Sequence, residues 1–230
     1  MGVVNMEALT EMFETQDGSH SLIALDYGVS YHSKYGAVQE SRHVFIEAGL
    51  YSLLLKKKPL QLLEIGFGTG LNAFLTFLEA ERLQIPIHYE AIEAFPLAVN
   101  LISALNYPKT AASDAYPGIF QELHETPWEA DVQVGSFFTL HKRKEKAEVL
   151  HYLPRFDLIY YDAFAPGAQP ELWETQVLSA MYLALKPGGV LVTYCAKGEV
   201  KRRLKTIGFS LESLQGPPGK REMIRARKPE

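Results

Sequence analysis

Residues 64–74 read Glu-Ile-Gly-Phe-Gly-Thr-Gly-Leu-Asn-Ala-Phe, with Gly66, Gly68 and Gly70 at alternate positions. The apolar run 60–65 comes before the glycines and the apolar-periodic segment 71–83 follows them, so the pattern predicts a strand, a tight loop and a helix. Glycine adopts positive φ and lets the backbone approach a ligand closely, at an entropic cost that an ordinary turn need not carry. The stretch therefore predicts a loop built around a bound molecule.

On both sides of this loop, predicted strands alternate with predicted helices. We expect strands at 60–65, 86–92, 156–161 and 190–194, and helices at 43–55, 71–83, 96–105, 171–185 and 199–207, with the segment 186–189 (KPGG) ending the fourth helix. This alternation predicts an α/β fold of the Rossmann-like type, with a mostly parallel sheet covered on both faces. The tail 209–227 reads as two strands joined by a Gly/Pro turn, an antiparallel hairpin at or near the sheet edge.

The first part of the chain reads as a small extension of this sheet domain. Residues 10–25 predict a β-hairpin with Asp17 and Gly18 in the turn, and a polar loop, 31–41, follows. We therefore expect an N-terminal β-hairpin and loop extension over 1–36 and the main domain over 37–230. A length of 230 residues suits one domain with such an appendage.

Composition narrows the class of protein. An apolar fraction of 47% and a charged fraction of 22% are ordinary for a globular protein. No apolar run is long enough to cross a bilayer and the N-terminus lacks a signal-peptide pattern, so we expect no membrane association and a cytoplasmic location. The single cysteine, Cys195, ends an apolar run and predicts a buried structural thiol. The seven histidines form no HExxH or HxH pattern, so we predict no metal site.

The formal net charge of −4 argues against a protein coated in basic residues. Positive charge is nevertheless clustered at 56–58, 141–144, 197–205 and 220–221. Each cluster taken alone is typical of a solvated surface or a helix end, but an acidic protein can still bind RNA when its cations gather around one cleft.

The spacing of the glycines selects among ligands. A P-loop needs Gly-Lys-Ser/Thr after the glycines, and here Gly70 is followed by Leu71 and Asn72. A dinucleotide loop is spaced GxGxxG, and Leu71 stands where its third glycine would fall. Glu64, just before the first glycine, is unfavourable beside a pyrophosphate but suits a sulfonium or ammonium cation. The loop 66–70, with Phe67 inside it, therefore favours S-adenosylmethionine.

A second acidic residue, Glu93, closes the next predicted strand. A carboxylate at this point can accept hydrogen bonds from both ribose hydroxyls of a nucleoside. Because NAD-dependent enzymes use the same device, Glu93 discriminates weakly, and a dinucleotide stays open as the alternative ligand.

A third acidic residue, Asp162, directly follows the predicted strand 156–161 and is followed by Ala-Phe-Ala-Pro. Ligands of open α/β sheets bind beyond the carboxyl ends of the strands, so Asp162 is expected to face the reactive end of the cofactor. Phe164 and Pro166 offer a rigid apolar wall against which a base could stack. The motif is not the Asn/Asp-Pro-Pro-Tyr/Phe of adenine-N6 methyltransferases, which disfavours that activity, while an aminopropyltransferase stays open.

Seven motifs occur together in one order: YHSKYGAVQESRHVF (31–45), LEIGFGTGLNAF (63–74), EAFP (93–96), YDAFAPGAQPELW (161–173), LKPGGVLVTY (185–194), VKRRLKTIGF (200–209) and GPPGKREM (216–223). From about residue 25 onward the chain resembles the methyltransferase part of the MnmC-like family of bacterial tRNA wobble-uridine enzymes. The glycine loop alone is generic, whereas DAFAP…PELW with GKREM is distinctive. The resemblance implies a class I S-adenosylmethionine-dependent fold and methylation of the aminomethyl nitrogen on C5 of the wobble uridine of tRNA.

The resemblance also implies roles for single residues. Asp162 would orient the amine, and whether it also takes the proton is left open. Tyr31 and Ser33 match a stretch of the family that closes over the active site. The candidate phosphate contacts are Lys220 and Arg221, together with Lys201, Arg202 and Arg203.

Two further expectations concern the cofactors and the partners. The chain has no second glycine-rich nucleotide motif, so it resembles a stand-alone methyltransferase without flavin, supplied with its aminomethyl-uridine precursor by a separate enzyme. The acidic residue that often holds the adenine amino group is not clear after the fourth strand, and Glu145 is the nearest candidate. The rival function is a small-molecule amine N-methyl- or aminopropyltransferase on the same fold.

Overall fold

The computed structural model describes residues 10–56, 59–111, 115–116 and 118–230. Its centre is an eight-stranded sheet with the order β10-β11-β9-β8-β4-β5-β7-β6. The strands are β4 (Leu60–Ile65), β5 (Ile87–Ile92), β6 (Asp131–Val134), β7 (Phe138–Arg143), β8 (Phe156–Tyr161), β9 (Leu185–Thr193), β10 (Ser210–Gln215) and β11 (Glu222–Arg227). The neighbours from β9 through β8, β4 and β5 to β7 run parallel, which confirms the predicted α/β fold.

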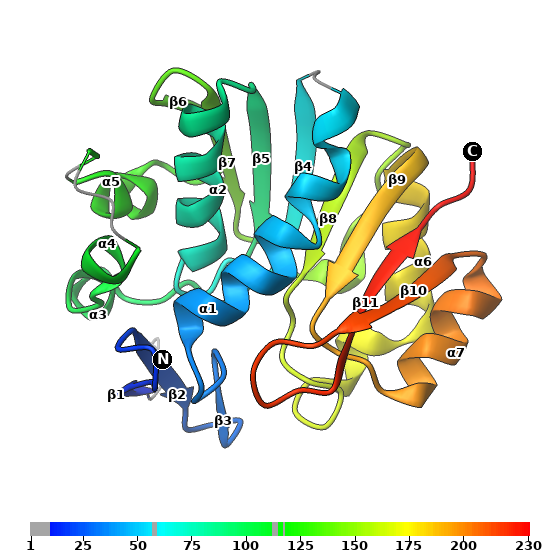
Figure 1. Cartoon of the computed structure of the whole chain (residues 1–230), viewed down its shortest axis with the longest axis horizontal. Coiled ribbons are helices and arrows are strands. Elements are labelled where there is room, and N and C mark those ends of the chain that lie inside the picture. The colour runs from blue at the N-terminus through cyan, green and yellow to red at the C-terminus, as the bar shows by residue number, and fades with distance from the viewer. Residues whose placement is uncertain (1–9, 57–58, 112–114, 117) are drawn as a thin grey trace, which may run out of the picture.

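Helices cover both faces of this sheet (Figure 1). One face packs against α1 (Ala37–Ser41), α2 (Leu71–Leu83), α3 (Val99–Ser103), α4 (Tyr107–Thr110) and α5 (Ile119–Glu125). The other face packs against α6 (Thr175–Ala184) and α7 (Gly198–Ile207). Because successive side chains of a strand point to opposite faces, Leu62 of β4 joins the first core and Leu63 the second. Each face therefore has its own hydrophobic core.

The predicted C-terminal hairpin is confirmed. β10 pairs antiparallel with β11, and β11 pairs antiparallel with β9, so β10 forms one edge of the sheet. The predicted N-terminal hairpin is confirmed as well. β1 (Thr10–Glu14) pairs with β2 (His20–Ala24), and a short strand that was not predicted, β3 (Val29–Ser30), extends it to three strands. The division of the chain at residue 36 stays a prediction.

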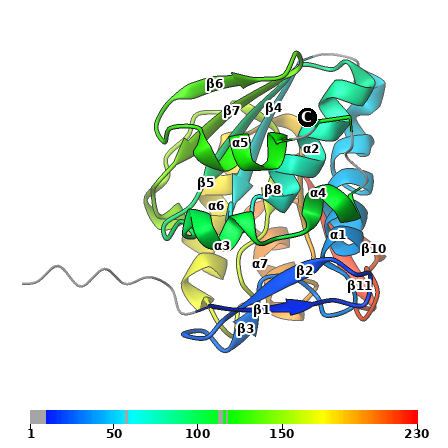
Figure 2. The same cartoon turned by 90° about the vertical axis from the view of Figure 1, so that its left-hand side faces the viewer.

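The N-terminal sheet is held against the main domain by its turn. The amide of Asn106 donates to the Gly18 carbonyl, and Asn106 Oδ1 accepts from the His20 N–H, both at 2.8 Å. Figures 1 and 2 show β1–β3 at the same end of the molecule as the loop that joins β10 to β11. This end lies beyond the carboxyl ends of β4 and β8, where the glycine loop and Asp162 begin.

The predicted helix boundary at residue 43 was wrong, because the helix begins at Ala37. It continues as a π-helical segment, Arg42–Glu47, and a 3₁₀ segment, Leu50–Lys56. The polar appearance of 31–41 misled the prediction, since Glu40 and Ser41 are buried in the structure. Glu40 pairs with Lys220, which lies 180 residues further along the chain and leaves no local pattern.

The end of the fourth predicted helix was also wrong. The segment 171–185 divides into the 3₁₀ helix Pro170–Trp173 and α6, and β9 already begins at Leu185. The segment 186–189 lies inside β9 as an irregularity, because Phe156 pairs with Leu185 while Leu158 pairs with Val190. The predicted helix 96–105 shortens to α3, and residues 106–155, for which the pattern predicted no element, hold α4, α5, β6, β7 and the 3₁₀ turn Ala147–Val149.

Three other expectations meet the structure here. Cys195 is buried and unpaired, as predicted. In the described ranges, no helix combines the length and apolar character needed to span a membrane. Lys57 and Lys58 of the basic cluster 56–58 lie outside the described residues.

Candidate active site

A cavity of about 510 Å³ lies beyond the carboxyl ends of β4, β5 and β8. This volume is in the range of sites for small molecules. Its walls come from the glycine loop, the turn after β5, the segment after β7, the loop after β8 and the N-terminal extension. The structure therefore brings five separate parts of the sequence to one concave site.

The glycine loop follows β4 and turns directly into α2. Gly66, Gly68 and Gly70 all have positive φ, 91°, 49° and 72°. A Cβ on Gly66 would lie 2.9 Å from the Asp162 carbonyl oxygen, and one on Gly70 would lie 2.5 Å from His124 Nε2. Conformation and close approach both exclude larger residues here, so the glycines bring the loop after β4 against the loop after β8.

Glu93 is held at the end of β5 by the backbone of two loops. Its Oε2 accepts from the Gly68 N–H at 3.0 Å and its Oε1 accepts from the Phe95 N–H at 2.8 Å. Burial raises the pKa of the carboxyl, while the hydrogen bonds from Phe95 and Gly68 oppose that rise. Because a carboxylate has about four acceptor positions, this fixed group lines the cavity with capacity left for hydroxyl groups.

Asp162 and Glu64 are joined by one amide. Asn72, in the first turn of α2, donates from Nδ2 to Asp162 Oδ2 at 2.8 Å and to Glu64 Oε1 at 2.9 Å. Asp162 and Asn72 line the cavity, whereas Glu64 is fully buried behind them and does not. Burial, and next to it the charge of Glu40, raises the pKa of Asp162 to about 7, against the Asn72 hydrogen bond. Burial also raises the pKa of Glu64 well above its ordinary value.

The mouth of the cavity is aromatic. Phe164 meets Tyr31 at a centroid distance of 5.0 Å, edge to face, and Tyr27 at 5.5 Å. The Phe164 backbone is fixed on both sides, because its N–H donates to Gln169 and its carbonyl accepts from the Trp173 indole. Tyr31 and Tyr27 come from the N-terminal extension, which therefore supplies part of the cavity wall.

Two further predicted residues reach the cavity. Phe67 lines it while its ring packs on His124 at 5.1 Å and faces the buried Lys142 ammonium at 5.6 Å. Glu145, after β7, also lines it and pairs with Arg143 at 2.5 Å. The ion pair with Arg143 therefore fixes this carboxylate in the part of the cavity wall that follows β7.

Besides Glu64, the predicted residues Gly70, Ser33, Pro166, Lys220 and Arg221 do not line this cavity. The Ser33 N–H donates to Glu40 Oε2 at 2.7 Å and its hydroxyl accepts from the Tyr35 N–H, so Ser33 shapes the loop behind Tyr31. Of the predicted apolar wall, only Phe164 reaches the cavity. Lys220 pairs with Glu40 instead.

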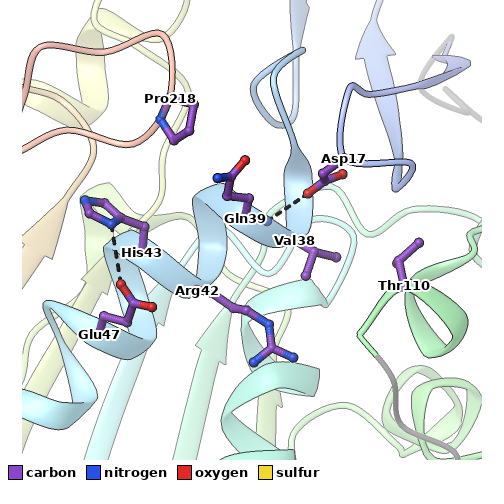
Figure 3. A pocket seen from close by; sticks show the side chains of 8 residues that line it. All are labelled: Asp17, Val38, Gln39, Arg42, His43, Glu47, Thr110 and Pro218. Carbon is purple, nitrogen blue, oxygen red and sulfur yellow. Dashed lines mark hydrogen bonds and ion pairs between the residues drawn. The ribbon is translucent and has the colours of Figure 1, made fainter.

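A second hollow, of about 430 Å³, lies between the N-terminal turn, α1 and the loop at Pro218 (Figure 3). Its polar groups are engaged within the protein. The Gln39 N–H donates to Asp17 at 2.9 Å, His43 pairs with Glu47 at 3.4 Å, and Arg42 donates to the Ala111 carbonyl. None of the acids that line the larger cavity borders this hollow, so it contributes nothing to the candidate active site.

Comparison with known proteins decides the class of enzyme. A family described as S-adenosyl-L-methionine-dependent methyltransferase matches residues 113–229. The chain belongs to that family. S-adenosylmethionine is therefore the cofactor of this methyltransferase, which resolves the choice between a sulfonium cofactor and a dinucleotide.

Relatives and a solved structure agree with this identification. A tRNA 5-methylaminomethyl-2-thiouridine biosynthesis bifunctional protein MnmC from Burkholderia multivorans is 28% identical over 222 residues, 89% of this chain and 33% of that protein. One from Paracidovorax citrulli is 30% identical over 212 residues, 87% of this chain and 33% of that protein. The methyltransferase thus spans about a third of the length of these curated relatives.

The crystal structure of MNMC2 from Aquifex aeolicus matches with a TM-score of 0.77 at 25% identity. The match covers 98% of this chain and 74% of that one. The predicted class I fold and the resemblance to MnmC-like proteins are confirmed.

The residues that line the cavity fit the cofactor. Positive-φ glycines let the backbone approach it, and the backbone-fixed Glu93 has acceptor capacity left for hydroxyls. Among the described residues, Asn72 Oδ1 is buried without a hydrogen-bond partner, so the end of the cavity near Asp162 has an acceptor for an ammonium or a water.

Sequence reasoning missed Asn72 and Tyr27. Asn72 interrupts the apolar face of the helix directly after the glycine loop, a signal that could have marked it. Tyr27 has no comparable signal, because only the packing of the N-terminal sheet brings it to Phe164.

Proposed function

We propose that this methyltransferase transfers a methyl group to the aminomethyl nitrogen of 5-aminomethyl-(2-thio)uridine at the wobble position of tRNA. The observation that carries the proposal is the single cavity that joins the glycine loop and Glu93 to Asp162 under an aromatic mouth. The MnmC names of the relatives support the same substrate.

S-adenosylmethionine supplies an electrophilic methyl group on a positively charged sulfur. Transfer of that methyl group to the uridine amine would leave S-adenosylhomocysteine and would require the nitrogen to give up one proton. Only the neutral amine has a lone pair, and alkylamines are mostly protonated at neutral pH. Asp162, with its pKa raised to about 7, suits the task of orienting the amine and accepting its proton directly or through water.

Three groups of the chain suit the cofactor. The backbone of 66–70 approaches it, Glu93 accepts the ribose hydroxyls, and Glu145 accepts the adenine amino group. Glu64 acts from behind Asn72, holding the amide that orients Asp162, with its free oxygen open to a water-mediated contact. Much of the rate enhancement then comes from holding the amine and the methyl group in a reactive geometry. Such orientation can lower the activation barrier by on the order of 7–11 kcal/mol.

The aromatic mouth suits an unstacked base. Single-stranded RNA bases are commonly bound by stacking on aromatic side chains, and an anticodon loop offers such bases. Tyr27 is 40% exposed, and it lies beside Phe164 at the rim.

Exposed cations of α7 and of the β10–β11 loop suit the phosphates of tRNA. Lys201 pairs with Glu222 at 2.5 Å, and Arg203 donates to the Trp173 carbonyl at 2.9 Å. Arg202 and Arg221 are exposed and form no ion pair with any described residue. We therefore assign the phosphate contacts to Arg202 and Arg221. Each contact should contribute about one unit to the slope of log affinity against log salt concentration.

The precursor must come from an activity that leaves an unmethylated aminomethyl group on the uridine. We propose that a separate enzyme supplies it and that both act in the cytoplasm, on tRNA. The curated relatives are named bifunctional.

The test is methyl transfer from labelled S-adenosylmethionine to tRNA isolated from cells that lack this gene, with a polyamine panel in parallel. We expect label in tRNA, and nucleoside mass spectrometry should show an aminomethyl-uridine converted to its methylaminomethyl form. Label in the polyamines with none in tRNA would establish the small-molecule transferase instead.

A further inference from the structure

Lys220 is held by the protein itself. Its ammonium lies 2.5 Å from Glu40 Oε1 and 3.8 Å from the centroid of the Tyr194 ring. Glu40 exposes only 8% of its side chain, and its other oxygen accepts from the Ser33 N–H. A cation engaged by a buried carboxylate and an aromatic face is poorly placed to neutralise a phosphate.

The loop that carries Lys220 packs directly on the N-terminal loop. Gly219 has a φ of +83°, and a Cβ there would lie 2.0 Å from the Tyr35 ring. Tyr35 belongs to the same loop as Tyr31, which lines the cavity. The ion pair therefore joins the β10–β11 loop, α1 and a loop of the cavity wall.

The pair also reaches the residue proposed to receive the amine. Tyr194, under the Lys220 ammonium, donates its hydroxyl to the carbonyl oxygen of Ala163 at 2.9 Å. Ala163 directly follows Asp162, so the Tyr194 hydroxyl fixes the backbone next to the reacting carboxylate. The charge of Glu40 raises the pKa of Asp162, and the charge of Lys220 lowers it.

Other groups act on Asp162 from the remaining elements. Asn72 of α2 donates to it, and burial has the largest effect on its pKa. The other titratable side chains that interact with it are Glu64 of β4, Tyr89 of β5 and Tyr194. Glu40 and Lys220 differ from all of these because they carry opposite charges whose effects oppose each other.

We propose that Glu40 and Lys220 form a positioning pair that clamps the β10–β11 loop onto the cavity wall and, through Tyr194 and the Ala163 carbonyl, fixes the backbone beside Asp162. The inference rests on the proposed function only in taking Asp162 as the group that receives the amine. Lys220 is then a positioning residue, and not a phosphate contact.

The first test follows the titration of Asp162 itself by NMR of protein labelled with ¹³C at the aspartate carboxyls, with Asp162→Asn to assign the signal. Lys220→Met leaves Glu40 uncompensated and should raise the pKa of Asp162 by about half a unit or more, whereas Glu40→Gln should lower it. Lys220→Arg should stay near the wild type. The acid limb of the kcat–pH profile should move in the same directions.

Opposite shifts separate this role from a merely structural one, because loss of packing would move both variants the same way or not at all. Shifts in the same direction, or no shift in a variant whose thermal unfolding shows it to be folded, would overturn the proposal. The NMR titration needs no RNA, so it decides the pair even if the wild type methylates no tRNA.

The second test compares neighbouring cations in tRNA binding. Arg221→Ala should reduce the slope of log affinity against log salt by about one, and Lys220→Met should leave that slope unchanged. If Lys220→Met reduced this slope by about one and left the pKa of Asp162 unchanged, Lys220 would be a phosphate contact. That result would overturn the proposal.

Discussion

The cofactor side and the substrate side of the cavity are built in different ways. The cofactor side comes from β4, the glycine loop, α2 and β5, which follow one another in the sequence. On the proposed substrate side, Asp162 shares the cavity with Tyr31 and Tyr27 of the N-terminal extension, and the charge of Lys220 near the C-terminus lowers its pKa.

The contrast separates two kinds of constraint. Most groups proposed to bind the cofactor, the glycine loop and Glu93, lie in one continuous stretch of the chain, and Glu145 after β7 is added to them. The proposed substrate is a macromolecule, and under that proposal the N-terminal extension and the β10–β11 loop supply surface to recognise and position it. Asn72 and Gly66 are the places where the two sides touch.

The largest expected effect tests the substrate side. Asp162→Ala should lower kcat by about 10²–10⁴-fold, because the amine loses the group that orients it and accepts its proton. The dissociation constant of S-adenosylmethionine, measured by calorimetry, should change little. Near-normal turnover in this variant would remove Asp162 from the mechanism.

The pH dependence of the wild type sharpens the same point. Because burial raises the pKa of Asp162 to about 7, its carboxylate is lost as pH falls through that value. We expect kcat to decline below pH about 7. That limb should be absent from the residual activity of Asp162→Asn.

The corresponding test on the cofactor side changes Glu93. Glu93→Ala removes the acceptor for the ribose hydroxyls and for the N–H groups of Gly68 and Phe95. Loss of hydrogen bonds to a charged group should weaken S-adenosylmethionine binding by roughly 10–100-fold. At saturating cofactor kcat should largely recover, unlike in Asp162→Ala. An unchanged dissociation constant would contradict the ribose assignment.

A smaller effect is expected where the two sides touch. Gly66→Ala places a Cβ at 2.9 Å from the Asp162 carbonyl oxygen and strains a φ of 91°. The matched control is Gly18→Ala, with a φ of 82° and nothing within 4 Å of the new Cβ. The control should lose about 1–2 kcal/mol of unfolding free energy.

Gly66→Ala should lose more stability than this control in chemical denaturation, and it should lose both cofactor affinity and turnover. Equal losses of stability in Gly66→Ala and Gly18→Ala would mean that the close approach of the loops after β4 and β8 makes no contribution to stability.

The smallest effect on turnover is expected at Lys142, which is buried behind the glycine loop and whose test is stability. Its ammonium donates to the carbonyls of Leu123 and His124 and faces the Trp128 ring at 5.0 Å. Burial lowers its pKa from 10.5 to about 8, so the unfolded chain binds more protons between these values. Relative to Lys142→Met, the wild type should therefore gain stability as pH rises from about 8 to 10.5. A pH-independent difference in denaturant midpoints would show that burial does not perturb Lys142.

The elements that were predicted correctly share one property, which is a local signal. β4, α2 and β8 were predicted at their observed bounds because an apolar run or an apolar period ended at a glycine or a polar residue. The start of α1 was missed because Glu40 is polar yet buried. Its ion-pair partner, Lys220, lies 180 residues away and therefore outside any sequence window.

The sequence by itself determined the parallel sheet, the sulfonium-type glycine loop and the acids Glu64, Glu93 and Asp162, because backbone conformation and strand ends are written in neighbouring residues. Only the tertiary structure decided which acids face the cavity. It buried Glu64 behind Asn72, brought Tyr27 to Phe164 and turned Lys220 toward Glu40. Burial and charge pairing depend on segments far apart in the chain, so their outcome is fixed by packing and not by local pattern.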